Sequence, residues 1–185
     1  HVAKAEGAAG HGHGVRAAFL EEVPLVSLPV TDVQVIEMPE IHRGVAVAYC
    51  DSPGPLETTP LPTFVAVAPT PSTWDAERIE SFFREYNGVQ LHDLTIHEAF
   101  PGHVLQLAHS RVAENATRVR AFGRSSVFIE GWAVYAEELM INSGYLPVDD
   151  QRSAYALRLQ QLKMQTRMII NAILDVRVHT GDIDE

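Results

Sequence analysis

The sequence contains a single cysteine, Cys50, among its 185 residues, which excludes a disulfide within the chain and a zinc site built from cysteines. Every apolar run falls short of the ~18 residues needed to span a membrane, so no membrane-spanning segment is expected. Basic residues are also few: 14 Lys and Arg against 24 Asp and Glu give a formal net charge of -10. This deficit argues against a nucleic-acid partner, because phosphate binding needs concentrated positive charge.

What remains is the composition of a folded globular protein, with 46% hydrophobic and 21% charged residues. Residues 1–22 are rich in Ala, Gly and His and predict a flexible or linker-like segment. Residues 23–185 are enough for a single domain with its own core. We expect an α+β fold, mainly helical, with a small antiparallel sheet. Short runs of small and β-branched residues bounded by prolines predict its strands at 33–36, 45–49 and 63–68.

Apolar residues recur at helical spacing in four later segments, 74–86, 91–120, 127–142 and 149–179. Pro101-Gly102 interrupts the second segment, which predicts one irregular helix or two helices joined there. In the third segment Glu130 and Glu137 are seven residues apart and share a helix face. Most of that helix is apolar, so buried carboxylates on it need a partner or a metal ion.

The stretch His97-Glu98-Ala99-Phe100-Pro101-Gly102-His103 contains two imidazoles and a carboxylate. Neutral imidazole is a good zinc ligand, and a carboxylate beside a metal site can accept a proton from water. The common zinc-protease motif places its histidines four residues apart on one helix face. A spacing of six turns a regular helix by about 600° and leaves the histidines about 120° apart. A break at Pro101-Gly102 could bring His103 back beside His97.

With Gln106 added, this stretch resembles the H-E-A-x-P-G-H-x-x-Q signature of the bacterial DUF885 family. The resemblance extends over most of the chain, from about Pro29 to Gly181. Further matching segments lie on both sides of the motif, at Glu37-Met38-Pro39, Ala48–Gly54, Arg84–Asn87 and Glu130–Glu137. The family is grouped with gluzincin-like metallopeptidases, whose third zinc ligand is a glutamate on a later helix. The resemblance therefore implies a metallopeptidase-like catalytic domain.

By this resemblance, the zinc ligands are His97, His103 and Glu130, and Glu98 is the general base. Glu130 is preferred over Glu137 as the third ligand because it begins the Glu-Gly-Trp-Ala segment that matches the family. Glu137 lies two turns further along the same face and would orient a histidine from behind.

Two more residues are assigned by the resemblance alone. Gln106 would form a hydrogen bond within the site or to the substrate. His179 matches a D-x-x-x-H-x-G stretch and could donate a hydrogen bond to an oxyanion. It could equally cap the C-terminus of its own helix, where a protonated histidine is favoured.

The predicted reaction is zinc-dependent hydrolysis of a peptide or small amide by a metal-activated water, with Glu98 moving the proton to the leaving amine. An edge strand could pair with an extended substrate, or the sheet could be purely structural. Two other functions stay open. One is a metal-dependent hydrolase or lyase of a small molecule. The other is a metal-free structural or binding domain in which the two histidines and Glu98 form a buried polar network.

Members of the resembled family are usually far longer than this chain. We therefore expect a catalytic half that packs against a missing remainder of the protein. An open groove and an exposed apolar surface are predicted where that remainder would lie.

Overall fold

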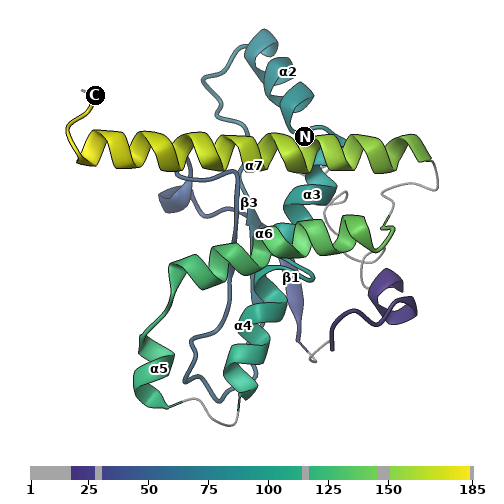
Figure 1. Ribbon diagram of the computed structural model, residues 1–185, viewed down its shortest axis with the longest axis vertical. Helices are drawn as coiled ribbons and strands as arrows, with labels where there is room; N and C mark the ends of the chain where they lie inside the picture. Colours follow the sequence, from purple (N-terminus) through teal and green to yellow (C-terminus); the bar gives the residue numbers. More distant parts are fainter. Residues whose placement is uncertain (1–17, 28–30, 114–116, 146–150, 184–185) are drawn as a thin grey trace.

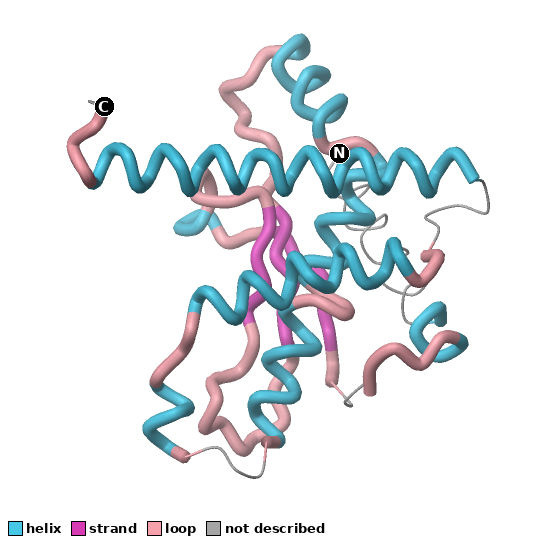
Figure 2. The backbone as a smooth tube through the Cα atoms, viewed as in Figure 1, coloured by secondary structure: helices cyan, strands magenta, loops and turns pink. Residues whose placement is uncertain are grey.

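A computed structural model describes residues 18–27, 31–113, 117–145 and 151–183 of the chain. Most of the linker-like segment predicted at 1–22 lies outside the described residues. Its last part, residues 18–22, is helical, and Leu20 is buried in the core. Helices dominate the molecule, and one small sheet lies among them (Figures 1 and 2). The predicted α+β class is confirmed.

The sheet has three strands, β1 (Val33–Glu37), β2 (Ala48–Asp51) and β3 (Thr63–Val67), in the order β1-β3-β2. β2 runs antiparallel to β3, with Cys50 opposite Val65. β1 runs parallel to β3, so the sheet is mixed, and the prediction of a wholly antiparallel sheet is wrong in this respect. The reason is that β1 pairs with β3 and not with β2, its neighbour in sequence. As a result β2 is an edge strand.

The segment predicted as one helix or two at 91–120 forms three helices: α3 (Gly88–Glu98), α4 (His103–Val112) and the short α5 (Arg118–Phe122). The break predicted at Pro101-Gly102 is present between α3 and α4. The other helices lie close to the predicted segments. They are α2 (Ala76–Glu85), α6 (Ser126–Asn142) and α7 (Gln151–His179). A 3-10 turn that was not predicted, η1 (Glu40–His42), lies between β1 and β2.

Side chains cap the first turns of α2, α3 and α6, which explains where these helices begin. Asp75 accepts a hydrogen bond from the backbone N–H of Arg78 at the start of α2. Asn87 accepts from two backbone N–H groups of α3, and Ser125 accepts from the backbone N–H of Phe128 in α6. The Asn87 cap fixes the start of the helix that ends in the His-Glu motif.

Helix α3 lies at the centre of the fold and packs against α6, α7 and β2 (Figure 1). Because it is covered on several sides, it buries polar side chains as well as apolar ones: Gln90, Asp93, Thr95 and Glu98. Burial of charged groups is costly unless they are paired or coordinate a metal. The apolar core around the helix consists of Leu20, Val65, Ile96, Ala99, Phe100, Val104, Leu105, Ala136, Met140, Tyr145 and Leu157.

The two halves of α7 differ in their surroundings. The first half buries Leu157 and Gln161, and the second half extends beyond α6 toward the C-terminus (Figure 1). Large apolar side chains are exposed along that second half: Met168, Ile169, Ile170, Ile173, Leu174, Val176 and Val178. The predicted exposed apolar surface is therefore present, and its packing against a further part of the protein stays a prediction. No helix in the described part of the chain is long and apolar enough to cross a membrane.

Candidate metal centre

The chain turns sharply between α3 and α4. Ala99 leaves the helical conformation, with φ -111° and ψ -105°. The backbone N–H of Gly102 then donates to the carbonyl oxygen of Ile96 at 2.9 Å, in place of a regular helical hydrogen bond. Only glycine fits at this point, because a Cβ on Gly102 would lie 1.9 Å from the carbonyl oxygen of His97. This close approach brings the start of α4 back to the end of α3.

Helix α6 holds this turn in place. The indole N–H of Trp132 donates a hydrogen bond of 2.8 Å to the carbonyl oxygen of Pro101, whose peptide bond to Phe100 is cis. Trp132 lies two residues after Glu130 on α6. The same helix therefore fixes the turn that positions His103 and supplies the carboxylate that faces it. The sequence prediction did not include Trp132.

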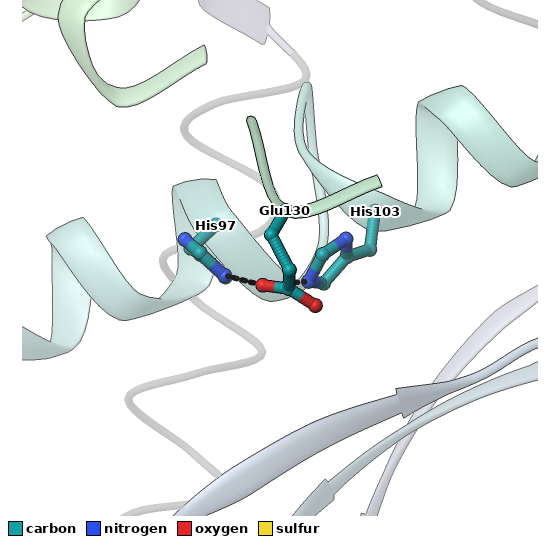
Figure 3. Close-up of side chains that lie close together, drawn as sticks. All are labelled: His97, His103 and Glu130. Carbon is teal, nitrogen blue, oxygen red and sulfur yellow. Dashed lines mark ion pairs between the residues drawn. The ribbon is translucent and has the colours of Figure 1, made fainter. Parts of the chain in front are cut away.

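Three predicted ligands converge from three helices: His97 from the end of α3, His103 from the start of α4 and Glu130 from α6. The two imidazole rings have centroids 4.7 Å apart. Nε2 of His97 lies 3.4 Å from Oε2 of Glu130, and Nε2 of His103 lies 3.7 Å from the same oxygen. Figure 3 shows the carboxylate between the two rings. One donor atom from each residue lies within 4.8 Å of the other two.

Two of the three separations between the donor atoms can be compared with those of a zinc site. Zn–N and Zn–O bonds of ~2.0–2.1 Å at tetrahedral angles place ligand atoms ~3.3–3.4 Å apart. The separations of 3.4 and 3.7 Å from the Glu130 oxygen are close to this value. The histidines are largely covered, whereas the Glu130 side chain is 62% exposed. The cluster is therefore open to solvent on the side of its carboxylate.

Behind His97 lies a pair of buried carboxylates. Glu137 of α6 is 2.7 Å from Nδ1 of His97, so that ring nitrogen can donate to Glu137 and Nε2 is left toward the cluster. Asp93 lies one turn before His97 on α3, and burial together with the negative charge of Glu137 raises its pKa to about 8. Burial raises the pKa of Glu137 as well. Asp93 was not predicted, although its spacing of four from His97 on a helix could have indicated it.

The two histidines differ in protonation. Burial by itself lowers the pKa of His97, but hydrogen bonds to Glu130 and Glu137 outweigh it and raise the pKa to about 10. Burial and the neighbouring charge of His97 lower the pKa of His103 to about 4. In the absence of a metal ion, these opposite pKa shifts favour the charged form of His97, between carboxylates, and the neutral form of His103. Nδ1 of His103 has no hydrogen-bond partner among the described residues.

Glu98, the last residue of α3, is buried next to the sheet. Burial raises its pKa to about 7, while the charge of His97 and a hydrogen bond from the backbone of Cys50 act in the opposite direction. Cys50 belongs to the edge strand β2. The predicted general base thus lies between the three converging side chains and the edge strand of the sheet.

The structure does not bring the other two predicted residues into the cluster. Gln106 lies one turn after His103 on α4, donates a hydrogen bond of 2.7 Å to Ser110, and lines a neighbouring cavity. His179 is exposed at the end of α7, where its Nδ1 lies 2.8 Å from the carbonyl oxygen of Asp175, one turn earlier. That end of α7 projects away from α3, α4 and α6 (Figure 1). Two roles were considered for His179, a hydrogen bond to an oxyanion and a contact at the end of its own helix. The structure shows the second.

These features describe a mainly helical α+β protein with a candidate metal centre of two histidines and a glutamate. Residues 15–185 match the family model described as "Bacterial protein of unknown function (DUF885)", which covers nearly the whole chain. The chain belongs to this family, and the resemblance predicted from the motifs is confirmed. Neither the curated proteins nor the solved structures contain a match to it.

Proposed function

We propose that the protein is a zinc-dependent hydrolase of peptide or related amide bonds. The observation that carries the proposal is the convergence of two imidazole nitrogens and a carboxylate oxygen within 4.8 Å of one another. Three protein ligands leave one coordination position open, which is typical of catalytic and not structural zinc sites. Zinc bound there would supply a Lewis acid that activates water and polarises the scissile carbonyl.

Glu98 would act as the general base. It is next to the ligand His97 in sequence, it is buried, and its pKa is raised to about 7. A carboxylate with such a pKa can accept a proton from the attacking water and return it to the leaving amine near neutral pH. Glu137 would hold His97 through Nδ1, which fixes the ring orientation that the ligand role requires.

The sheet supports a peptide as substrate. β2 is an edge strand, and the backbone of Cys50 within it reaches Glu98. An extended peptide could add to this edge through main-chain hydrogen bonds and would then pass beside the general base. A compact small molecule would have no use for the strand edge.

The test is a substrate screen with zinc-loaded protein. We expect cleavage of peptides by the wild type and none by Glu98→Gln, which should keep its zinc. Esters and non-peptide amides belong in the same screen. Turnover of these alone would replace the peptidase by a hydrolase of small molecules, and elimination without water uptake would indicate a lyase. If the purified chain binds zinc but the screen gives no turnover at all, the proposal fails.

A further inference from the structure

A cavity of about 330 Å³ opens beside the candidate metal centre. Its walls come from α4, from the connection between α5 and α6, and from the loop that follows β2. Each of these segments continues an element of the centre. α4 begins with His103, α6 carries Glu130, and β2 contains Cys50, whose backbone reaches Glu98. The cavity is therefore built from segments that adjoin the elements of the candidate metal centre in sequence.

The face of α4 that presents His103 runs on into the cavity. Gln106 and Leu107 follow His103 by three and four residues, and Ser110 and Arg111 follow it by seven and eight, so all four return to the same side of the helix. Eight residues of α-helix cover about 12 Å. An extended peptide spans that distance with about four residues. A substrate at the metal centre can thus reach Arg111 with a short flanking segment.

Two arginines, Arg111 and Arg124, line the cavity. Neither forms an ion pair within the part of the chain that the structure describes. The chain as a whole has 14 Lys and Arg against 24 Asp and Glu, so two unpaired cations in one cavity stand out against its acidic balance. Guanidinium groups bind carboxylates through paired, charge-assisted hydrogen bonds. Gln106 and Ser110, already hydrogen-bonded to each other, add neutral polar groups to the same wall.

We propose that this cavity binds a carboxylate of the substrate, with Arg111 and Arg124 as its partners. The inference rests on the proposed hydrolysis of peptides at the metal centre and specifies their class. Preferred substrates carry a negative charge a few residues from the scissile bond, either as a free C-terminus or as an Asp or Glu side chain. A free C-terminus and an acidic side chain present the same chemical group, and the probes of the experiment distinguish between them.

The experiment measures binding by titration calorimetry, with zinc-loaded Glu98→Gln protein as the background so that peptides stay intact. The probes are acetyl-pentaalanine with a free C-terminus, its C-terminal amide, and the amide with glutamate as last residue. We expect the free acid to bind about ten- to a hundredfold more tightly than the plain amide. Arg111→Gln or Arg124→Gln should remove most of this difference. Arg84→Gln on α2, where Arg84 pairs with Glu80 on the surface, is the matched control and should leave it unchanged.

The glutamate-containing amide identifies the source of the charge. Tight binding of this amide as well as of the free acid means that any carboxylate suffices. Tight binding of the acid alone means recognition of the C-terminus, and tight binding of the glutamate amide alone means recognition of an acidic side chain. Equal binding of all three probes overturns the proposal, as does a carboxylate preference that survives both arginine substitutions or the absence of measurable binding of every probe. Because binding needs no turnover, a wild type that discriminates the probes but cleaves none refutes the proposed hydrolysis and leaves the cavity assignment in place.

Discussion

The two sides of the candidate metal centre differ in their contact with water. On the inner side Asp93, Glu98 and Glu137 are only 2%, 9% and 5% exposed. On the outer side the Glu130 side chain is 62% exposed, and the arginine-lined cavity opens nearby. The inner carboxylates have raised pKa values, whereas a hydrogen bond from His97 lowers that of Glu130.

This contrast separates two tasks. Burying a carboxylate costs free energy, and apolar side chains of similar size would often stabilise a fold as well or better. Carboxylates with perturbed pKa values in such places are candidates for orienting ligands and moving protons. The outer side carries less of this cost, because the Glu130 side chain is largely exposed to water. Under the proposed function, the inner carboxylates would orient a ligand and move a proton, and the outer side, where the proposed ligand Glu130 is exposed, would admit the substrate.

The largest effect is expected on the inner side, from Glu98→Gln. The amide cannot accept a proton, so turnover of a cleaved peptide should fall by about a thousandfold. Zinc content should stay at the wild-type level, because Glu98 is not among the three converging ligands. Initial rates and elemental analysis on the same preparation measure both. Retained turnover would show that Glu98 is not the general base. It would also contradict the role in proton transfer that the inner carboxylates have under the proposed function.

The turn between α3 and α4, which brings His103 beside His97, can be disrupted with Gly102→Ala. The added Cβ would lie 1.9 Å from a backbone oxygen, so the chain must shift there. We expect the free energy of unfolding in urea to drop by about 3 kcal/mol. Gly131→Ala is the matched control, since a Cβ on this residue of α6 meets nothing within 4 Å. It should raise the stability by up to about 1 kcal/mol. Equal stability of the two variants would mean that the turn is not formed as described.

A smaller effect is expected for Glu137→Gln. The substitution removes the negative charge that holds Nδ1 of His97 at 2.7 Å. Zinc affinity should weaken about ten- to a hundredfold, as for other partners of metal-bound histidines. Competition with a chromophoric chelator measures the change. Glu138→Gln, one residue further on the same helix, should have no effect, and an equal loss in both variants would argue for a general charge effect.

The smallest effect concerns protons released on zinc binding. The pKa of His97 is raised to about 10 without metal, so at pH 8 this imidazole is protonated and must lose its proton to become a ligand. His103, with a pKa of about 4, is already neutral. Binding should therefore release at least one proton per zinc at pH 8, one from His97 and a further one where the zinc-bound water ionises, and affinity should fall as the pH is lowered. Calorimetry in buffers of different ionisation enthalpy counts the protons. A count near zero would contradict the charged state of His97.

Much of the candidate metal centre could be predicted from the sequence, because its residues fall in short matching segments. The convergence of His97 and His103 could not, since a regular helix separates them by about 120°. It depends on the backbone at 99–102 and on the hydrogen bond from Trp132, which comes from a helix distant in sequence. Asp93 was not predicted, although it lies four residues before His97 and therefore on the same face of the helix.

Other features depend on contacts between segments that are distant in sequence. Order along the chain suggested an antiparallel sheet, but β1 passes β2 and pairs in parallel with β3. For His179, which ends a helix of 29 residues, the structure has the alternative contact within its own helix, with Nδ1 2.8 Å from the carbonyl oxygen of Asp175. A short motif match does not indicate how far a residue lies from the other motifs in the folded chain.

The central claim is that His97, His103 and Glu130 bind zinc, and metal content tests it most directly. Wild type, Glu130→Ala and Glu138→Ala are purified without chelators, incubated with zinc, desalted and subjected to elemental analysis. We predict about one zinc per chain in the wild type and in Glu138→Ala, and a large loss in Glu130→Ala. A wild type that retains no zinc after this treatment would contradict the account and leave the histidines and carboxylates as a buried polar network.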